Sequence, residues 1–468
     1  MLTQTGRYRT YAVVAAAVLL LVGTAKAQDA RSIGMGGVVV PGRSAAAANP
    51  AYAAVSDDAH VTLTLPLGLI GIASAAMDMF DGEAPLDAAI PLYATLASLN
   101  TYLFGLPPGV LGVTFDTSIG DDGLPIVRID LAEDSAFDVG AASWRVARAV
   151  ELPLRIPAGP VTIGVRPYLT TGVQLELDRD LRAIFGAGTS RGSARGTLSA
   201  ESGVAIDVAF ATQVPSELLG MAEAANAQRV YVGVRGGPFI GLAKAAGNAT
   251  ITVEALLDNG EPAYEASYTG DLFVSTVATD GVSFGALFDV GFVIETDVEG
   301  GTAIFGAGVT GVGLGVWRGN RYELQGVELE GGTLPEPTPA TQTLFSSDLG
   351  VLLNGAYVSS PSPSIDLLVA GDVGYRAGRF LAHVGAEGTF HVDDAFRLAA
   401  RAGVGIEDGL RLGVGAGILA SEVTFDVGVS LQRVPFTQRS AFGVGASVGF
   451  PSDALRATEA APPAPPSP

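Results

Sequence analysis

The residues best suited to chemistry in this chain are its three histidines and the acidic side chains near them. His383 and His391 fall on the same face of an alternating segment as Glu387, whereas His60 stands alone near the start of the chain. Residues four apart on a strand are separated by roughly 13 Å, at about 3.3 Å per residue, so one strand cannot place these groups around a shared metal ion. A Ser-His-Asp hydrolase is the alternative, but polar residues on an enclosed face need no catalytic role. We expect no enzymatic activity, no metal and no cofactor.

Charged residues recur at alternate positions of the predicted strands and carry both signs. Those expected on the enclosed face are Arg166, Asp289, Asp372, Arg376, Glu387, Arg397, Arg401 and Arg411. A ring of one sign would select ions, whereas mixed signs can pair across an interior or with a segment that fills it. The mixture therefore predicts charges that hold an interior together.

The strands that position these groups are clearest in the last quarter of the chain, residues 380–450. Apolar or small residues alternate there with Arg, His, Glu, Asp and Gly. Period two places successive side chains on opposite faces, and short links between the segments indicate antiparallel hairpins. Further strands are expected at 61–69, 161–178, 204–210, 229–241, 247–257, 263–277, 282–295, 302–317 and 364–376.

Other stretches interrupt the alternation. Helical spacing predicts short helical inserts at 75–99 and 216–228. The acidic, proline-containing residues 318–346 are expected to form a long loop.

The length of the strands favours a membrane barrel over a soluble β-sandwich, which would also alternate. Segments of about ten residues cross a bilayer when tilted, and aromatic residues gather near segment ends, as at Phe380, Phe390 and Phe450. We predict an all-β fold, a transmembrane antiparallel β-barrel of about 14–18 strands, with an N-terminal plug segment and short helical inserts.

Bulk composition excludes some classes of function. The 468 residues include no Cys and carry a formal net charge of −21. Disulfides and thiolate chemistry are therefore excluded, and the acidic balance argues against nucleic acid as a partner, because phosphate backbones need Lys and Arg.

The two ends of the chain differ from the barrel pattern. Residues 1–27 are expected to be a secretory signal peptide, since basic residues precede an apolar run and Ala25-Lys26-Ala27 resembles a cleavage site. The barrel is expected over residues 61–450. The proline-rich residues 451–468 are expected to be a disordered tail.

Residues 28–60 carry the remaining motif. Small residues surround Arg31, Gly34-Met35-Gly36-Gly37 and Asn49-Pro50-Ala51. Glycines allow tight turns here, but no strand precedes them as a dinucleotide-binding loop would require. The alternative interpretation is a simple lead-in turn to the first strand.

This motif resembles the start of FadL-type outer-membrane barrels, a superfamily of fatty acid and hydrocarbon transporters with PorV-like and TraF-like relatives. Tyr52 stands where the fatty acid transporters usually have Gly. The resemblance implies that residues 28–60 fold inside the barrel as a hatch. It also implies location in the outer membrane of a Gram-negative-type bacterium, among its lipids.

Two functions follow from the resemblance. The first is a FadL-like uptake channel for hydrophobic small molecules, which predicts an apolar pocket beside the hatch. A lumen packed solid with side chains would count against this channel. The second is a non-transporting, PorV-like scaffold for a secretion or surface protein, which long external loops, the helical inserts and the proline-rich tail fit equally well.

Overall fold

The computed structural model describes residues 30–55, 60–64, 113–119, 125–131, 143–151, 154–158, 161–177, 191–215, 228–258, 261–327, 336–346, 349–376, 379–393, 395–407, 409–420, 423–433 and 440–451. Its helices are α2 (Ala30–Gly34), η1 (Arg43–Ala47), η2 (Pro50–Ala54) and α7 (Val277–Asp280). Its strands are β1 (His60–Thr64), β2 (Val113–Ile119), β3 (Pro125–Leu131), β4 (Ser143–Glu151), β5 (Leu154–Ala158), β6 (Val161–Leu177), β7 (Arg191–Gln213), β8 (Gln228–Asp258), β9 (Glu261–Thr276), β10 (Ser283–Val298), β11 (Gly301–Val327), β12 (Thr338–Phe345), β13 (Gly350–Ser362), β14 (Ile365–Arg376), β15 (Arg379–His391), β16 (Phe396–Ile406), β17 (Leu410–Ala420), β18 (Val423–Arg433) and β19 (Ser440–Pro451).

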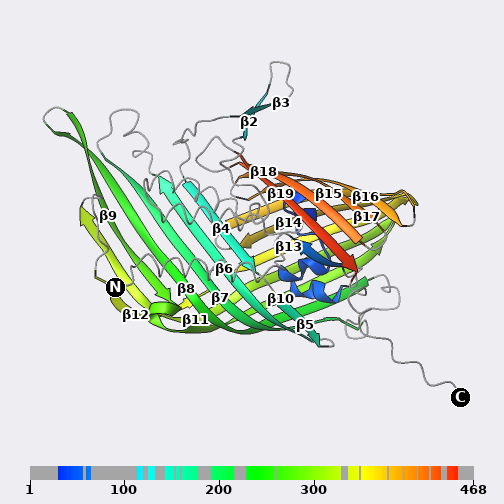
Figure 1. Ribbon diagram of the computed structural model, residues 1–468, viewed down its shortest axis with the longest axis horizontal. Coiled ribbons are helices and arrows are strands. Elements are labelled where there is room, and N and C mark those ends of the chain that lie inside the picture. The colour runs from blue at the N-terminus through cyan, green and yellow to red at the C-terminus, as the bar shows by residue number, and fades with distance from the viewer. Residues whose placement is uncertain are drawn as a thin grey trace, which may run out of the picture.

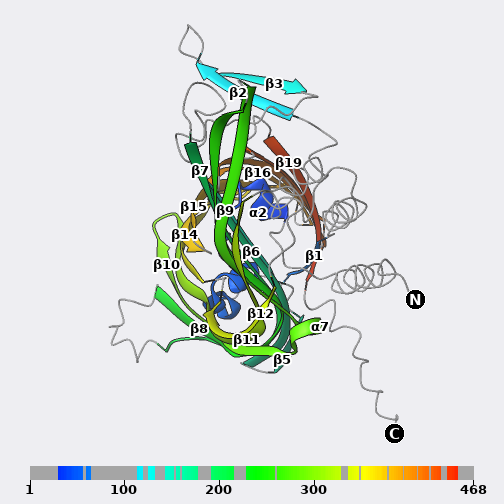
Figure 2. The same ribbon diagram turned by 90° about the vertical axis from the view of Figure 1, so that its left-hand side faces the viewer.

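The strands form one antiparallel sheet that curls into a barrel (Figures 1 and 2). Of the 19 strands, β4 and β5 both pair with β6, β9 and β10 both pair with β8, and β12 and β13 both pair with β11. Strands that share a neighbour in this way follow one another along the same side of that neighbour. The antiparallel barrel predicted from the sequence is confirmed.

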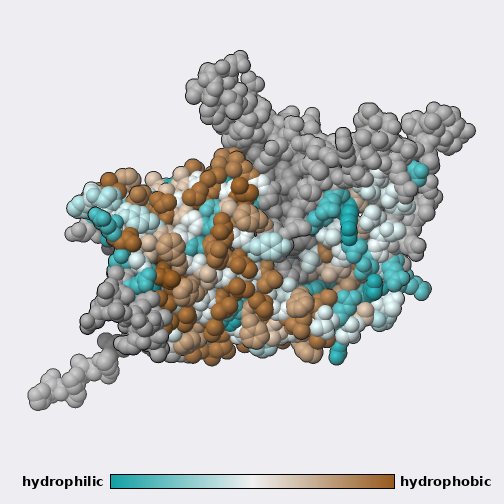
Figure 3. Space-filling model, turned by 180° about the vertical axis from the view of Figure 1, so that it is seen from behind, coloured by the Kyte–Doolittle hydropathy of each residue, from teal (hydrophilic) through white to brown (hydrophobic). Residues whose placement is uncertain are grey.

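Side chains alternate between the two faces of this wall. Outward positions are apolar and exposed, as at Phe288, Phe305 and Val414, whereas the inward Arg411 is fully buried. Figure 3 shows hydrophobic residues gathered over a broad zone of the outer surface. A barrel satisfies its backbone hydrogen bonds internally, so such a surface suits contact with lipid.

The last five strands agree closely with the alternation in the sequence, and so does β14. Other expectations were wrong. Residues 229–241 and 247–257 belong to one strand, β8, and residues 204–210 are part of the much longer β7. Both strands extend through small and polar residues, because backbone hydrogen bonds to the neighbouring strands stabilise them even where neither face is apolar.

The long loop expected at 318–346 is also wrong in its described parts. β11 continues to Val327 and pairs there with β9, while β12 pairs with the middle of β11. Pro339 is compatible with β12, whose pairings among the described residues are with β11 alone, because proline needs no ladder partner at an edge.

Several expectations lie outside the described residues: the signal peptide, most of 61–69, both helical inserts and the tail beyond Pro451. Among the helices that the structure describes, none has the length and apolar character to cross a bilayer.

The outward face gives a test of membrane embedding. Val414 lies in the middle of β17, and Ala420 faces the same way at its end. We expect Val414→Arg to lower the free energy of unfolding by about 2–4 kcal/mol and Ala420→Arg by at most about 1 kcal/mol, because a cation costs most at the bilayer midplane. Guanidinium titrations in phospholipid vesicles measure both, and equal effects would contradict embedding at this depth.

Candidate functional site

Residues 30–55, here called the N-terminal segment, lie inside the ring of strands (Figures 1 and 2). α2 ends in a turn in which Gly37 donates a backbone hydrogen bond to Ser32, while the Ser32 hydroxyl donates to the Val38 carbonyl. Gly36 and Gly37 have φ of 75° and 101°, a conformation that favours glycine. The Gly-Met-Gly-Gly motif therefore makes a turn that side chains would strain.

The first half of the segment packs against glycines on the inner wall. A Cβ on Gly403 would lie 2.1 Å from the Met35 carbonyl oxygen, and one on Gly428 would lie 2.2 Å from the Ala30 carbonyl oxygen. Gly413 meets Ile33 and Gly36 in the same way. Backbone thus contacts backbone, which only glycine on the wall allows.

Asn49 fixes the second half. Its side-chain amide donates to the carbonyls of Phe292 on β10 and Ala307 on β11, at 3.0 and 3.1 Å. Its side-chain oxygen accepts from the Ala51 backbone N–H at 3.0 Å and so caps η2, where Pro50 occupies the first position. Asn49 is fully buried, so no water competes for these bonds. Asparagine supplies both the donor and the acceptor that this position uses.

An ion-paired row ties the first half to the wall. Arg31 makes a two-pronged contact with Glu387 on β15, at 2.9 and 2.7 Å. Glu387 also accepts from Arg401 on β16, and Arg401 lies 2.6 Å from the Asp426 carboxylate on β18. Arg31 of the segment is therefore the last member of a row of alternating charges, whose other members lie on β15, β16 and β18.

A second polar row continues toward the β16–β17 turn. The Val39 backbone N–H donates to Asp372 at 2.7 Å, and the other Asp372 oxygen lies 2.7 Å from His383 Nδ1. Beyond it, Glu407 pairs with the buried Arg411 at 3.5 Å. Gly37 covers His383 and Arg411, since a Cβ there would lie 3.0–3.2 Å from both side chains.

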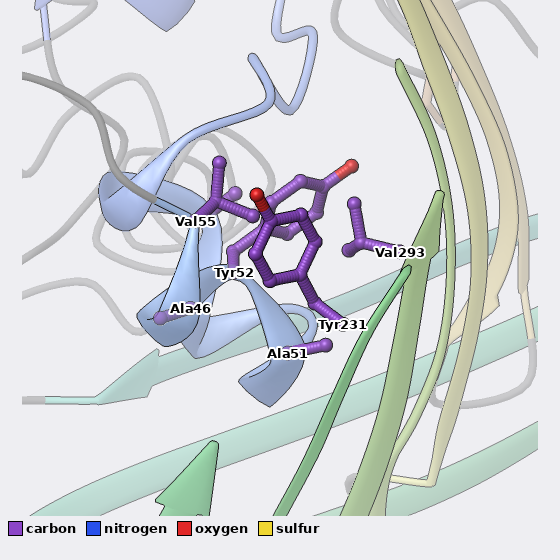
Figure 4. Close-up of a cluster of buried hydrophobic side chains, with 7 residues drawn as sticks. Ala46, Ala51, Tyr52, Val55, Tyr231 and Val293 are labelled. Atoms are coloured by element: carbon purple, nitrogen blue, oxygen red, sulfur yellow. The ribbon is translucent and has the colours of Figure 1, made fainter. Parts of the chain in front are cut away.

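Apolar contacts fill the remaining space beside the segment. In Figure 4 the ring of Tyr52 lies beside Tyr231 and Val293. The Tyr52 hydroxyl donates to Asn354 at 3.0 Å. Burial raises the pKa of Tyr52 well above its usual value and outweighs the opposite effect of that hydrogen bond, so the hydroxyl stays protonated.

The other residues of the predicted charge set are distributed along the wall. Arg166 pairs with Asp207 at 2.7 Å, and Asp289 pairs with Arg235 and accepts from the Gly311 N–H. Arg376 is half-buried beside Gly350, and Arg397 is half-buried opposite His391.

Sequence reasoning missed several partners of these charges. Arg235, which also donates to the Ala47 carbonyl, was not among the expected residues, nor were Glu407 and Asn354. For Arg235 and Asn354, the alternation in the sequence does indicate the inward face. Glu407 follows the end of β16 but continues the alternation of Arg397 and Arg401, so its face could be read from the sequence as well.

The described residues line one small cavity beside the wall charges and hold no metal-ligating cluster. A cavity of about 10 Å³, roughly one water, lies beside Arg166, Asp207 and Arg235. No group of three or more metal-ligating side chains occurs in the described part of the chain. The apolar pocket expected beside the hatch stays a prediction.

Comparisons with known proteins do not show a family for this chain. No protein-family model and no curated protein matches the chain. Similar solved structures include the CymD monoaromatic hydrocarbon channel (10% identity, 72% of this chain and 85% of that chain, TM-score 0.30). They also include the translocator domain of the autotransporter NalP from Neisseria meningitidis (10%, 66% and 88%, TM-score 0.19) and BamA from Haemophilus ducreyi lacking POTRA domains 1–3 (8%, 81% and 81%, TM-score 0.25).

The glycine contacts give a first test of segment docking. Gly403→Val would push a side chain into Met35 and Gly36 backbone, so we expect a loss of about 1–3 kcal/mol in unfolding free energy and trypsin cleavage after Arg31 in the folded barrel. Gly388→Val on the neighbouring strand meets nothing nearer than 3.9 Å and is the matched control. Mass spectrometry of the digests decides, and equal protection of Arg31 in both variants would contradict the contact.

Asn49 gives a second test. Asn49→Ala removes two buried hydrogen bonds to the wall and the cap of η2, so we expect a loss of about 1–3 kcal/mol in unfolding free energy. Thr212→Ala, which removes an exposed hydroxyl, serves as the control in the same denaturant titration. A change in Asn49→Ala no larger than in the control would show that these bonds contribute nothing.

Proposed function

We propose that this chain is a FadL-type outer-membrane barrel that takes up hydrophobic small molecules and is closed at rest by the N-terminal segment. One observation carries the proposal. The residues that resemble the FadL-type motif, from Arg31 through Gly34-Met35-Gly36-Gly37 to Asn49-Pro50-Ala51, all belong to the segment that packs against the inner wall. A lead-in turn to the first strand would not need these contacts.

Apolar surface under the segment supports a hydrophobic ligand. Met35, Val38 and Val40 cover Ala356 on β13 and Leu368 and Ala370 on β14. Elsewhere the inner wall is rich in paired charges, so these apolar side chains mark one of the places where the lumen could hold an apolar molecule. Displacement of the segment would expose them.

The many contacts that hold the segment favour a second function, that of a scaffold without transport. In the structure the segment is held by ion pairs, hydrogen bonds and apolar contacts, and β7, β8 and β9 extend far beyond the short strands (Figure 1). Such an extension suits binding of a secretion or surface protein. Transport therefore requires that the segment move, and scaffolding does not.

Uptake into lipid vesicles separates the two functions. We expect the reconstituted protein to accelerate entry of a fluorescent aromatic hydrocarbon several-fold over empty vesicles. Arg31→Ala together with Asn49→Ala, which loosens both halves of the segment, should accelerate it further. Arg229→Ala, in a partly exposed ion pair with Glu295, is the control.

The opposite result is equally clear. If neither the wild type nor the loosened variant exceeds empty vesicles, while both migrate as folded barrels in heat-modifiable gels, then transport of such molecules is excluded. The scaffold function would remain.

A further inference from the structure

We propose that the lumen contains a second closure, built from the wall itself and locked by Lys244. It comprises Tyr168, Ala205, Phe239, Phe273, Leu287 and Trp317, together with the ion pair of Lys244 and Glu201, and is called the wall cluster below. The inference rests on the proposed function, because it concerns the path that a transported molecule would take.

The wall cluster lies at a different level from the N-terminal segment. On β8 the segment contacts Gly233 and Arg235, whereas the cluster uses Phe239 and Lys244. On β11 the segment lies over Gly308, and Trp317 stands nine residues further, roughly 30 Å at about 3.3 Å per residue. β8 and β11 are both antiparallel to β10 and so run in the same direction. On both strands the wall cluster therefore lies on the same side of the N-terminal segment.

The rings of the cluster are held flat against the wall. Cβ atoms on Gly241 and Gly315 would lie 2.4 and 2.6 Å from the rings of Trp317 and Phe239, respectively. A ring on a barrel wall keeps its other face toward the lumen. Trp317 and Phe239 are nevertheless only 1% and 2% exposed, so that face is covered as well.

The cluster members cover one another across several strands. The ring of Tyr168 on β6 meets that of Phe239 edge-on, with 6.0 Å between the ring centres, and the ring centres of Phe239 and Trp317 on β11 lie 5.9 Å apart. Ala340 and Leu344 of β12 pack on the same group. The inner faces of β6 to β12 are therefore joined by a buried aromatic cluster.

Lys244 holds the wall cluster together through contacts with several strands. Its ammonium pairs with Glu201 on β7 at 2.7 Å, lies 5.0 Å from the centre of the Trp317 ring and donates to the Phe345 carbonyl at the end of β12. Glu201 in turn accepts from the Tyr168 hydroxyl at 2.9 Å. One buried cation thus connects β6, β7, β8, β11 and β12, and removal of a buried partner is costly because it leaves the other charge unpaired.

Conductance across planar bilayers tests the second closure. We expect deletion of residues 30–55 alone to produce no stable openings, because the second closure still opens only briefly. Adding Lys244→Ala with Trp317→Ala to the deletion should produce stable openings and raise conductance at least tenfold. Arg321→Ala, in a half-exposed pair with Asp271 outside the cluster, is the matched control in the same background and should stay closed.

Thiol labelling gives a readout that does not depend on current. The chain has no Cys, so Leu287→Cys introduces a single thiol inside the cluster. A membrane-impermeant maleimide should fail to label it when residues 30–55 are deleted and should label it once Lys244→Ala is added. Heat-modifiable migration identifies any variant that does not fold, and Lys244→Met with Glu201→Gln replaces the alanine variants in that case.

The outcomes separate this inference from the proposed function. Full conductance after deletion of residues 30–55 alone would overturn the second closure and leave closure by the segment intact. A folded double-site variant that still does not conduct would also overturn it. Stepwise opening without hydrocarbon uptake would support the second closure and reject the substrate class.

Discussion

The structure depends on one constraint: a chain that crosses lipid as strands must close its backbone hydrogen bonds around a ring. Closure divides every strand into an apolar outward face and an enclosed inward face. Polar groups on the inward face then need partners where water is scarce, because unpaired buried charges are costly. The pairs of Arg166 with Asp207, Arg235 with Asp289 and Lys244 with Glu201 are the result.

The same constraint explains why residues 30–55 are so rich in small side chains. A ring of this size leaves an interior that side chains from the wall fill only in part. Around β16 to β18 the wall carries glycines such as Gly403 and Gly413, and the segment's backbone occupies the vacated space. Where the wall carries large rings instead, as at Phe239 and Trp317, it fills its own interior.

Much of the fold, and part of the site, was readable from alternation alone. The faces of β14 to β19 follow from parity, which is how Asp372, Glu387 and Arg401 were assigned inward. Alternation did not predict the inward face where a strand changes phase. Opposite a register shift between Ser202 and Gly203, β8 changes phase, so Arg235 and Lys244 both face inward although nine residues separate them. Partner choice was also unreadable, since Arg235 and Asp289 meet only through the register of β8 with β10.

The difference in strand length has a consequence for how the molecule meets its surroundings. β8 spans 31 residues and β17 spans 11, and they belong to the same wall. Among the described strands one rim of the barrel is therefore oblique, and it is highest where the end of β8 pairs with the start of β9. Any macromolecule that approaches along the barrel axis from that side meets the paired ends of β8 and β9 before it reaches the lower rim, so these strand ends are the first part of the described wall that it can contact.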